Sequence, residues 1–195
     1  MSNKLQAKDL INVGIFTAIY FVMMFALMML GYIPVFIPLL AALIPLVGGI
    51  PFMLFLTKVK KFGMMLIMVI LICIFFLVSN AAVGVWVLSI GVICTLIAEF
   101  ILKSGGYESA KKSVLAYGLF CIFQFGNYIP IYITRNAYYE NLVSGYGTEY
   151  ADALMRFMPD WTAPVLAIGS FVFGILGGIL GRGVLKKHFQ RAGIA

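Results

Sequence analysis

The chain has 195 residues, of which 63% are hydrophobic and only 11% are charged. A soluble domain of this size cannot bury so much apolar surface in one core, so the composition indicates an integral membrane protein and excludes a second, soluble domain. We therefore treat residues 1–195 as a single transmembrane domain. The sequence contains no G-x-x-x-x-G-K-[ST] phosphate loop, which excludes a built-in ATP motor of that type.

The net charge of +7 does not indicate nucleic-acid binding, because the basic residues lie at the ends of apolar segments and not on one water-facing surface. Cys73, Cys94 and Cys121 lie inside apolar segments without a C-x-x-C motif, so we expect packing roles and neither a metal site nor disulfides. The sole histidine, His188, lies in the basic C-terminal tail, where it offers no base or zinc ligand to a protease site. We expect no enzyme activity, no catalytic residues and no cofactor.

Six segments approach the roughly 20 apolar residues that a helix needs to cross a bilayer. They are residues 10–30, 36–57, 62–80, 82–102, 113–134 and 161–185. The first is too long for a signal-peptide core and lacks a cleavage site, so we interpret it as an uncleaved helix. With both termini inside, only Arg135 and Arg156 of the 14 basic residues lie outside. The positive-inside rule thus predicts an all-α bundle of six transmembrane helices with cytoplasmic N- and C-termini in the plasma membrane of a bacterium.

The outer loops differ in length and character. The first, residues 31–38, stays apolar although Pro34 and Pro38 discourage continuous helix, and such a loop suits a lid. The longest, residues 135–160, carries four acidic residues and several tyrosines. Its amphipathic stretch, residues 148–157, predicts a short surface helix. We expect function at this outer face.

Small residues mark two of the segments. The sixth has them at four-residue spacing, at Ser170, Gly174, Gly177, Gly178 and Gly181. This spacing lets a helix approach closely, either within the bundle or on another protein. The second segment has Pro45, Gly48, Gly49 and Pro51, which predict a kinked or broken helix.

Polar and aromatic residues gather at the outer level. Gln124, Tyr128, Tyr132 and Arg135 share one face of a regular helix, with Pro130 bending it locally, and a polar face at this depth must point into the bundle or a wet cavity. Amides, phenols, one cation and flat rings together suit a planar, polar-edged small molecule. The candidate binding residues are Asn80, Trp86, Gln124, Asn127, Tyr128, Tyr132, Arg135 and Trp161. For the tryptophans an interfacial aromatic belt is the alternative.

Glu99 is the only acidic residue inside a predicted span. An ion-driven carrier needs such a group near the middle of the membrane, whereas Glu99 lies about one turn from the cytoplasmic end. We expect it to pair with Lys103 at i+4 or to reach water.

The whole chain resembles the S component of an energy-coupling factor (ECF) transporter, and within that class the MptD or Trep_Strep type. The resemblance covers the length, six spans with both ends inside, the opening K-D-L-I-N-V-G-I-F-T-A at residues 8–18, an apolar first outer loop and a long fifth loop. The family's first helix commonly carries an A-x-x-x-A pair that docks on the coupling subunit. Gly14 and Ala18 occupy the matching positions here, so the first alanine is replaced by glycine.

The resemblance implies a substrate-binding subunit that captures its solute under the first, third and fifth outer loops and then topples within the lipid bilayer. A transmembrane coupling subunit and two ATPases supply the energy. The resemblance does not transfer a substrate, and our hypothesis for the solute is a vitamin-like or heterocyclic micronutrient. Two alternatives remain open: an independent homodimeric carrier or facilitator that uses the glycine seams, and a non-transport membrane accessory subunit.

Overall fold

The computed structural model describes residues 6–191, and the side chains as far as Lys186. All regular structure in that range is helical, as the sequence predicts. The elements are α1 (Ala7–Met28), the 3-10 helix η1 (Met29–Tyr32), α2 (Phe36–Lys58), α3 (Met64–Ser79), α4 (Ala81–Ser104), α5 (Ala110–Cys121), the 3-10 helix η2 (Ile122–Asn127), α6 (Ile129–Ile133), α7 (Arg135–Tyr146), α8 (Thr148–Phe157) and α9 (Thr162–Arg191).

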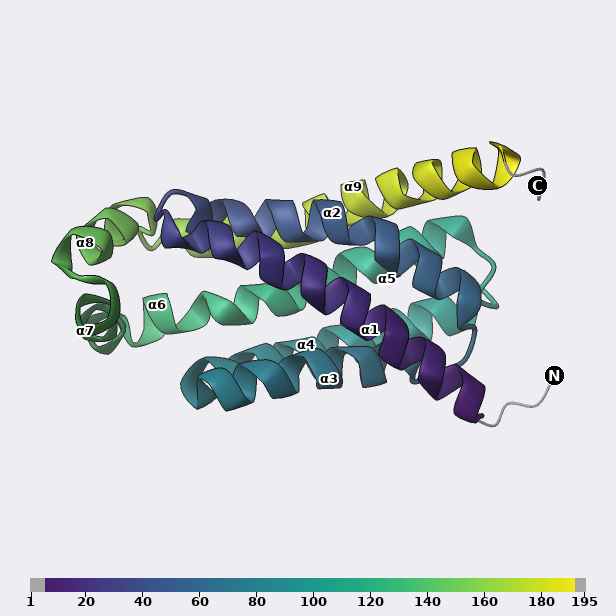
Figure 1. Ribbon diagram of the computed structural model, residues 1–195, viewed down its shortest axis with the longest axis horizontal. Helices are drawn as coiled ribbons and strands as arrows, with labels where there is room; N and C mark the ends of the chain where they lie inside the picture. Colours follow the sequence, from purple (N-terminus) through teal and green to yellow (C-terminus); the bar gives the residue numbers. More distant parts are fainter. Residues whose placement is uncertain (1–5, 192–195) are drawn as a thin grey trace.

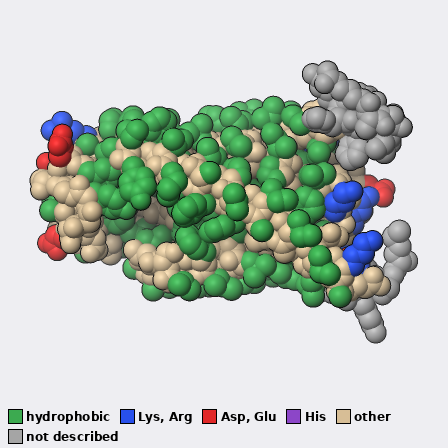
Figure 2. Space-filling model, viewed as in Figure 1, with side chains coloured by type: hydrophobic (Ala, Val, Ile, Leu, Met, Phe, Trp, Pro, Cys, Tyr) green, Lys and Arg blue, Asp and Glu red, His purple; other side chains and the backbone are tan. Residues whose placement is uncertain are grey.

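The helices form an elongated bundle with two chemically different ends (Figure 1). One end carries the start of α1, the end of α9, the last turns of α2 and α4 with Lys58 and Lys103, and the loop with Lys60 and Lys61, and we call it the basic end. The opposite end is capped by α7 and α8, and we call it the far end. Between them the surface is largely hydrophobic (Figure 2). The predicted positions of Lys4, Lys187, His188 and Arg191 lie outside the described side chains.

Four helical stretches within residues 6–191 are long and apolar enough to cross a membrane: Ala7–Tyr32, Phe36–Lys58, Ala81–Ser104 and Thr162–Lys186. α3 is equally apolar but has only 16 residues, about 24 Å at 1.5 Å per residue. The segment predicted as the fifth span is divided into α5, η2 and α6. The described part of the chain thus supports membrane insertion, with four spans of full length.

The 3-10 geometry of η2 changes which residues of the fifth segment share a face. A residue advances about 120° around a 3-10 helix and about 100° around an α-helix, so i and i+4 positions no longer coincide. Gln124 and Tyr128 point into the bundle, whereas Tyr132 and Arg135 belong to a different polar cluster. The single polar face predicted for these four residues is therefore wrong.

The sequence predicts a kink or a break in α2; this helix is continuous through Pro45 and Pro51, so the break is wrong. α5 is tied to this helix, because the hydroxyl of Tyr117 donates a hydrogen bond to the carbonyl oxygen of Pro45 at 2.7 Å.

The small residues of α9 serve packing inside the chain. A Cβ atom added at Gly177 would lie 2.2 Å from the carbonyl oxygen of Pro45, and one at Gly181 would lie 2.3 Å from that of Gly49. At Gly174 the added atom would meet Cα of Gly118 at 2.9 Å. Backbone contacts this close require glycine, and they seat α9 against α2 and α5.

Glu99 takes a position that the sequence did not suggest. Its side chain is buried, and its Oε1 accepts a hydrogen bond from the backbone N–H of Met65 at 2.8 Å. Met65 lies in the first turn of α3, which begins after Gly63, a residue without a side chain for capping. The expected pairing with Lys103 or with water is therefore wrong, because the free N–H groups at the start of α3 attract the carboxylate inward.

A second, smaller core lies at the far end. It joins residues of α6, α7 and α8 to the ends of α2 and α9: Ala41, Tyr128, Ile131, Leu142, Ala151, Leu154, Met158 and Leu166. The buried face of α8 confirms the amphipathic helix predicted over residues 148–157. This small core holds α7 and α8 over the end of the bundle.

Candidate binding cavity at the far end

A cavity of about 230 Å³ lies beneath α7, between α2, the start of α4, η2 and α6. Its polar lining consists of Gln124, Asn127, Tyr128 and Tyr138. The rest of the lining is aliphatic or methionine: Met28, Ile37, Leu40, Ile44, Val83 and Ile131. Three of the eight predicted binding residues, Gln124, Asn127 and Tyr128, are thus brought together. We call this space the far-end cavity.

A neighbouring hollow of about 320 Å³ shares Met28, Ile37 and Tyr138 with the far-end cavity. It extends between the end of α3 and the helices α7 and α8, and aromatic rings line much of it: Phe25, Tyr32, Phe75, Phe76, Tyr138, Tyr146 and Tyr150. The shared lining places the hollow next to the far-end cavity.

The buried amide of Gln124 is the chemically distinctive group in the cavity. Its side chain is 4% exposed. Its Oε1 accepts a hydrogen bond from Nδ2 of Asn127 at 3.4 Å. Its Nε2 has no hydrogen-bond partner among the described residues. A buried donor without a partner costs about 1–3 kcal/mol, so a ligand acceptor that reaches Nε2 from the cavity would relieve that cost.

Two tyrosine hydroxyls fasten the first loop to the elements that cover the cavity. Tyr128 donates to the carbonyl oxygen of Ile37 at 3.0 Å, and Tyr150 in α8 donates to that of Gly31 in η1. The rings of Tyr146 and Tyr150 stack with centroids 4.9 Å apart, and Tyr32 approaches Tyr146 edge-on. The apolar first loop and the long fifth loop therefore close the cavity together.

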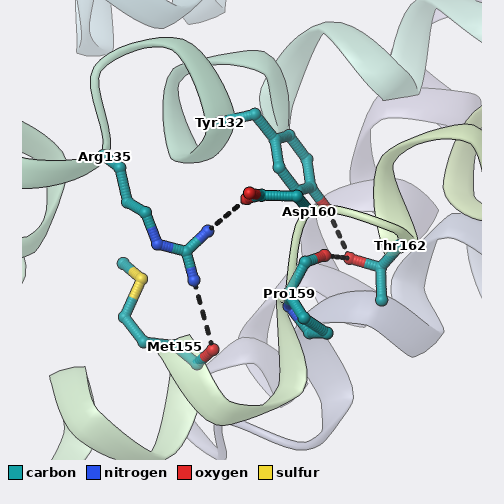
Figure 3. A network of polar contacts seen from close by, with 6 residues as sticks. All are labelled: Tyr132, Arg135, Met155, Pro159, Asp160 and Thr162. Atoms are coloured by element: carbon teal, nitrogen blue, oxygen red, sulfur yellow. Dashed lines mark hydrogen bonds and ion pairs between the residues drawn. The ribbon is translucent and has the colours of Figure 1, made fainter.

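Arg135 and Tyr132 belong to a separate polar network (Figure 3). The Nη1 atom of Arg135 lies 3.1 Å from Oδ1 of Asp160, and its Nη2 donates to the carbonyl oxygen of Met155 at 3.5 Å. The hydroxyl of Tyr132 is 2.7 Å from Oγ1 of Thr162. These contacts tie the start of α7 to the end of α8 and the start of α9. Both residues hold the cover in place and lie outside the lining of the far-end cavity.

The remaining predicted binding residues also lie outside the cavity lining. Asn80 caps α4, and its Oδ1 accepts from the backbone N–H of Val83 at 3.3 Å. Trp86 is 40% exposed on α4. Trp161 is 68% exposed and lines an apolar groove between α2 and α9. The tryptophan positions favour the interfacial aromatic belt.

Tyr138 is a cavity residue that the sequence analysis missed. It belongs to a series at four-residue spacing along the fifth loop, with Leu142, Tyr146 and Tyr150, and all four line the shared hollow. This spacing was visible in the sequence as a one-sided pattern. Burial raises the pKa of Tyr138 to about 12, so its phenol remains neutral at physiological pH.

A larger hollow of about 450 Å³ opens at the basic end. Its charged lining is Lys60, Glu108, Arg182 and Lys186. The side chains of Lys60 and Glu108 form an ion pair at 3.6 Å and are 51% and 79% exposed. These groups are already paired or open to solvent, whereas the far-end cavity is covered and contains a buried free donor. The far-end cavity is therefore the better candidate for specific binding.

Gly14 and Ala18 lie on the outward face of α1. A Cβ atom added at Gly14 would meet nothing within 4 Å, so this glycine serves no contact within the described chain. The adjoining Ile11, Ile15 and Val22 are also exposed. The small pair thus leaves a shallow place on an apolar helix face.

Comparison with known proteins agrees with the composition and the fold. Residues 7–191 match the model of a family described as hypothetical bacterial integral membrane protein (Trep_Strep). Neither a curated protein nor a solved structure matches the chain. The family and the apolar helices together indicate a multi-pass bacterial membrane protein. With nearly its whole length covered, the chain belongs to the Trep_Strep family of bacterial integral membrane proteins.

Proposed function

We propose that the protein is the substrate-binding S component of an ECF-type importer, with the far-end cavity as its solute site. The observation that carries the proposal is the covered cavity with a buried, unpaired amide donor at Gln124. The cover is built from the first and fifth loops, the elements expected to roof the site from the resemblance to S components. The absence of a phosphate loop from the sequence fits a subunit that relies on separate ATPases.

The proposed topology has six crossings, with the basic end in the cytoplasm. α3, and the composite of α5, η2 and α6, complete the set of six beside the four helices of full length. A short or divided helix is tolerated at membrane depth when other helices bury it, as the buried side chains Met68, Cys73, Tyr117 and Phe120 indicate. The concentration of lysines at the basic end supports the cytoplasmic assignment. The far-end cavity then opens from the outside.

The outward face of α1 around Gly14 and Ala18 is the proposed docking site for the transmembrane coupling subunit. Small residues allow close helix approach, which drives association where lipid supplies no hydrophobic force. Because a Cβ atom at Gly14 meets nothing within 4 Å among the described residues, we expect its replacement by leucine to leave the fold intact. The Gly14→Leu variant therefore tests docking without disturbing the fold.

The experiment is gentle extraction from native membranes followed by mass spectrometry of the co-purifying proteins. We expect a coupling subunit and two ATPases with the wild type and loss of all three with Gly14→Leu. Gly169→Leu is the matched control, because an added Cβ at Gly169 also meets nothing within 4 Å. Recovery of the chain alone, under conditions that preserve ECF complexes, would contradict the S-component assignment.

An independent homodimeric carrier is less well supported. The glycine seam of α9, which such a dimer would use, is occupied by α2 and α5. Glu99, the acidic residue on which an ion-coupled carrier would depend, accepts a hydrogen bond from Met65 in α3. A non-transport accessory subunit would have no use for a solute, so ligand binding by the isolated chain at micromolar affinity would argue against it.

A further inference from the structure

The chemistry of the far-end cavity limits the kind of solute that it accepts. This inference rests on the proposed function only in calling the bound molecule a solute. We propose that the cavity takes an uncharged, largely apolar small molecule that presents a hydrogen-bond acceptor, such as a carbonyl oxygen or an aromatic ring nitrogen, to Nε2 of Gln124.

The first argument is the lack of charge around the cavity. Neither the cavity nor the adjoining hollow is lined by a described Lys, Arg, Asp or Glu. Of the two arginines at this end of the bundle, Arg135 is engaged by Asp160 and by the carbonyl oxygen of Met155, and Arg156 is exposed on α8. The phenol of Tyr138 stays neutral. An ionic group entering this space would lose its hydration without gaining a counter-charge.

The second argument is the polarity of the buried, unpaired nitrogen of the Gln124 side chain. An amide Nε2 donates hydrogen bonds and does not accept them. Asn127 holds Oε1 of Gln124, so the donor side of the amide is the side left for a ligand. The hydroxyl of Tyr128 already donates a hydrogen bond to the carbonyl oxygen of Ile37. The cavity thus selects for an acceptor at one point and for apolar contact along the aliphatic walls.

Three small probes of nearly the same shape test this inference. Benzamide is neutral and has a carbonyl acceptor, benzoate is an anion, and benzamidinium is a cation without an acceptor. The purified full chain in lipid nanodiscs is titrated with each by saturation-transfer NMR. For ligands of this size we expect benzamide to bind at about 1–10 mM. We expect benzoate and benzamidinium to bind at least about tenfold more weakly, because each must be desolvated as an ion.

Variants of Gln124 locate the binding. Gln124→Met keeps the length of the side chain without the donor and should weaken benzamide binding about three- to tenfold. Gln124→Glu replaces the donor by an acid and should reverse the preference toward benzamidinium. Ser89→Ala, at an exposed position of α4 outside the cavity lining, should leave all three affinities unchanged. Either variant of Gln124 alone suffices if the other fails to fold.

Three results would overturn the inference: no binding of any probe at about 10 mM, binding of benzoate equal to that of benzamide, or benzamide binding unaffected by Gln124→Met. These measurements need no coupling subunit or ATPase. Gln124-dependent binding of benzamide by a chain that recovers no ATPases would keep the cavity assignment and reject the S-component role. Recovery of the coupling subunit and the ATPases without Gln124-dependent binding of benzamide would keep the S-component role and reject the cavity assignment.

Discussion

At the residue scale, Glu99 supplies the cap that the loop before α3 cannot provide. Gly63 precedes the helix with φ 91° and has no side chain, so the first-turn amide of Met65 depends on the carboxylate. We predict that Glu99→Ala lowers the free energy of unfolding by about 1–3 kcal/mol, because it leaves that buried N–H unpaired. Glu99→Gln retains an acceptor oxygen and should lose less.

Thermal unfolding of the purified variants in one detergent measures the effect of the Glu99 substitutions. Glu108→Ala is the matched control, since that side chain is 79% exposed at the same end of the bundle. If the Glu99→Ala protein has the same melting temperature as the wild type, the cap contributes nothing to stability. Uptake lost in Glu99→Gln at unchanged stability would instead revive an ion-coupling role.

The candidate site shows what residue patterns can and cannot predict. Gln124, Asn127 and Tyr128 lie within five positions of one another, so a polar cluster in an apolar segment was sufficient to find them. Arg135 looked equally suitable, but Asp160 engages it from 25 positions away in the sequence. Asp160 lies in the connection between α8 and α9, so nothing in the sequence next to Arg135 indicates that the two residues pair. Likewise, the inward turn of Glu99 depends on α3, 34 positions earlier.

At the scale of elements, α2 and α9 are joined through glycine backbones. We predict that Gly177→Ala destabilises the protein by about 1–3 kcal/mol, because the added Cβ would lie 2.2 Å from the carbonyl oxygen of Pro45 and the two helices would have to separate. Gly183→Ala on the same helix meets nothing within 4 Å and should be neutral or slightly stabilising. Thermal unfolding of this pair decides the matter, and equal melting temperatures would contradict the packing.

The cover of the cavity gives a second prediction for elements. Tyr150→Phe removes the hydrogen bond from α8 to Gly31 and should let the first loop open more often. Hydrogen exchange followed by mass spectrometry should then be faster in residues 29–37 than in the wild type. Tyr139→Phe is the control, because its hydroxyl bonds only to Asp152 within the α7–α8 pair. Unchanged exchange in residues 29–37 would mean that the hydrogen bond does not hold the loop.

Element types followed from the sequence more readily than element geometry. The first, second, fourth and sixth apolar segments form helices long enough to span a membrane, and the one-sided pattern of residues 148–157 matched α8 at both ends. The continuity of α2 through its prolines and the 3-10 turn of η2 were not predictable in this way. At η2 the geometry depends on a neighbour, because Gly126 lies against the backbone of Val87.

At the scale of the whole molecule, the proposed six-span topology depends on whether α5, η2 and α6 together cross the bilayer. Lys111 and Ser144 are exposed on either side of this segment, at the basic end and in α7. We predict that Ser144→Cys reacts with a membrane-impermeant maleimide in intact cells, and that Lys111→Cys reacts only after permeabilisation, as the positive-inside rule requires.

The wild type provides the blank for this labelling, because Cys73 and Cys121 are buried and Cys94 lies within α4. Labelling of both introduced cysteines from the same side would mean that the divided segment does not cross, and the far-end cavity would then face the cytoplasm or the lipid. The reverse labelling pattern would place the basic end outside. Either outcome removes the route by which a solute reaches Gln124 from outside, so this topology measurement bears directly on the importer assignment.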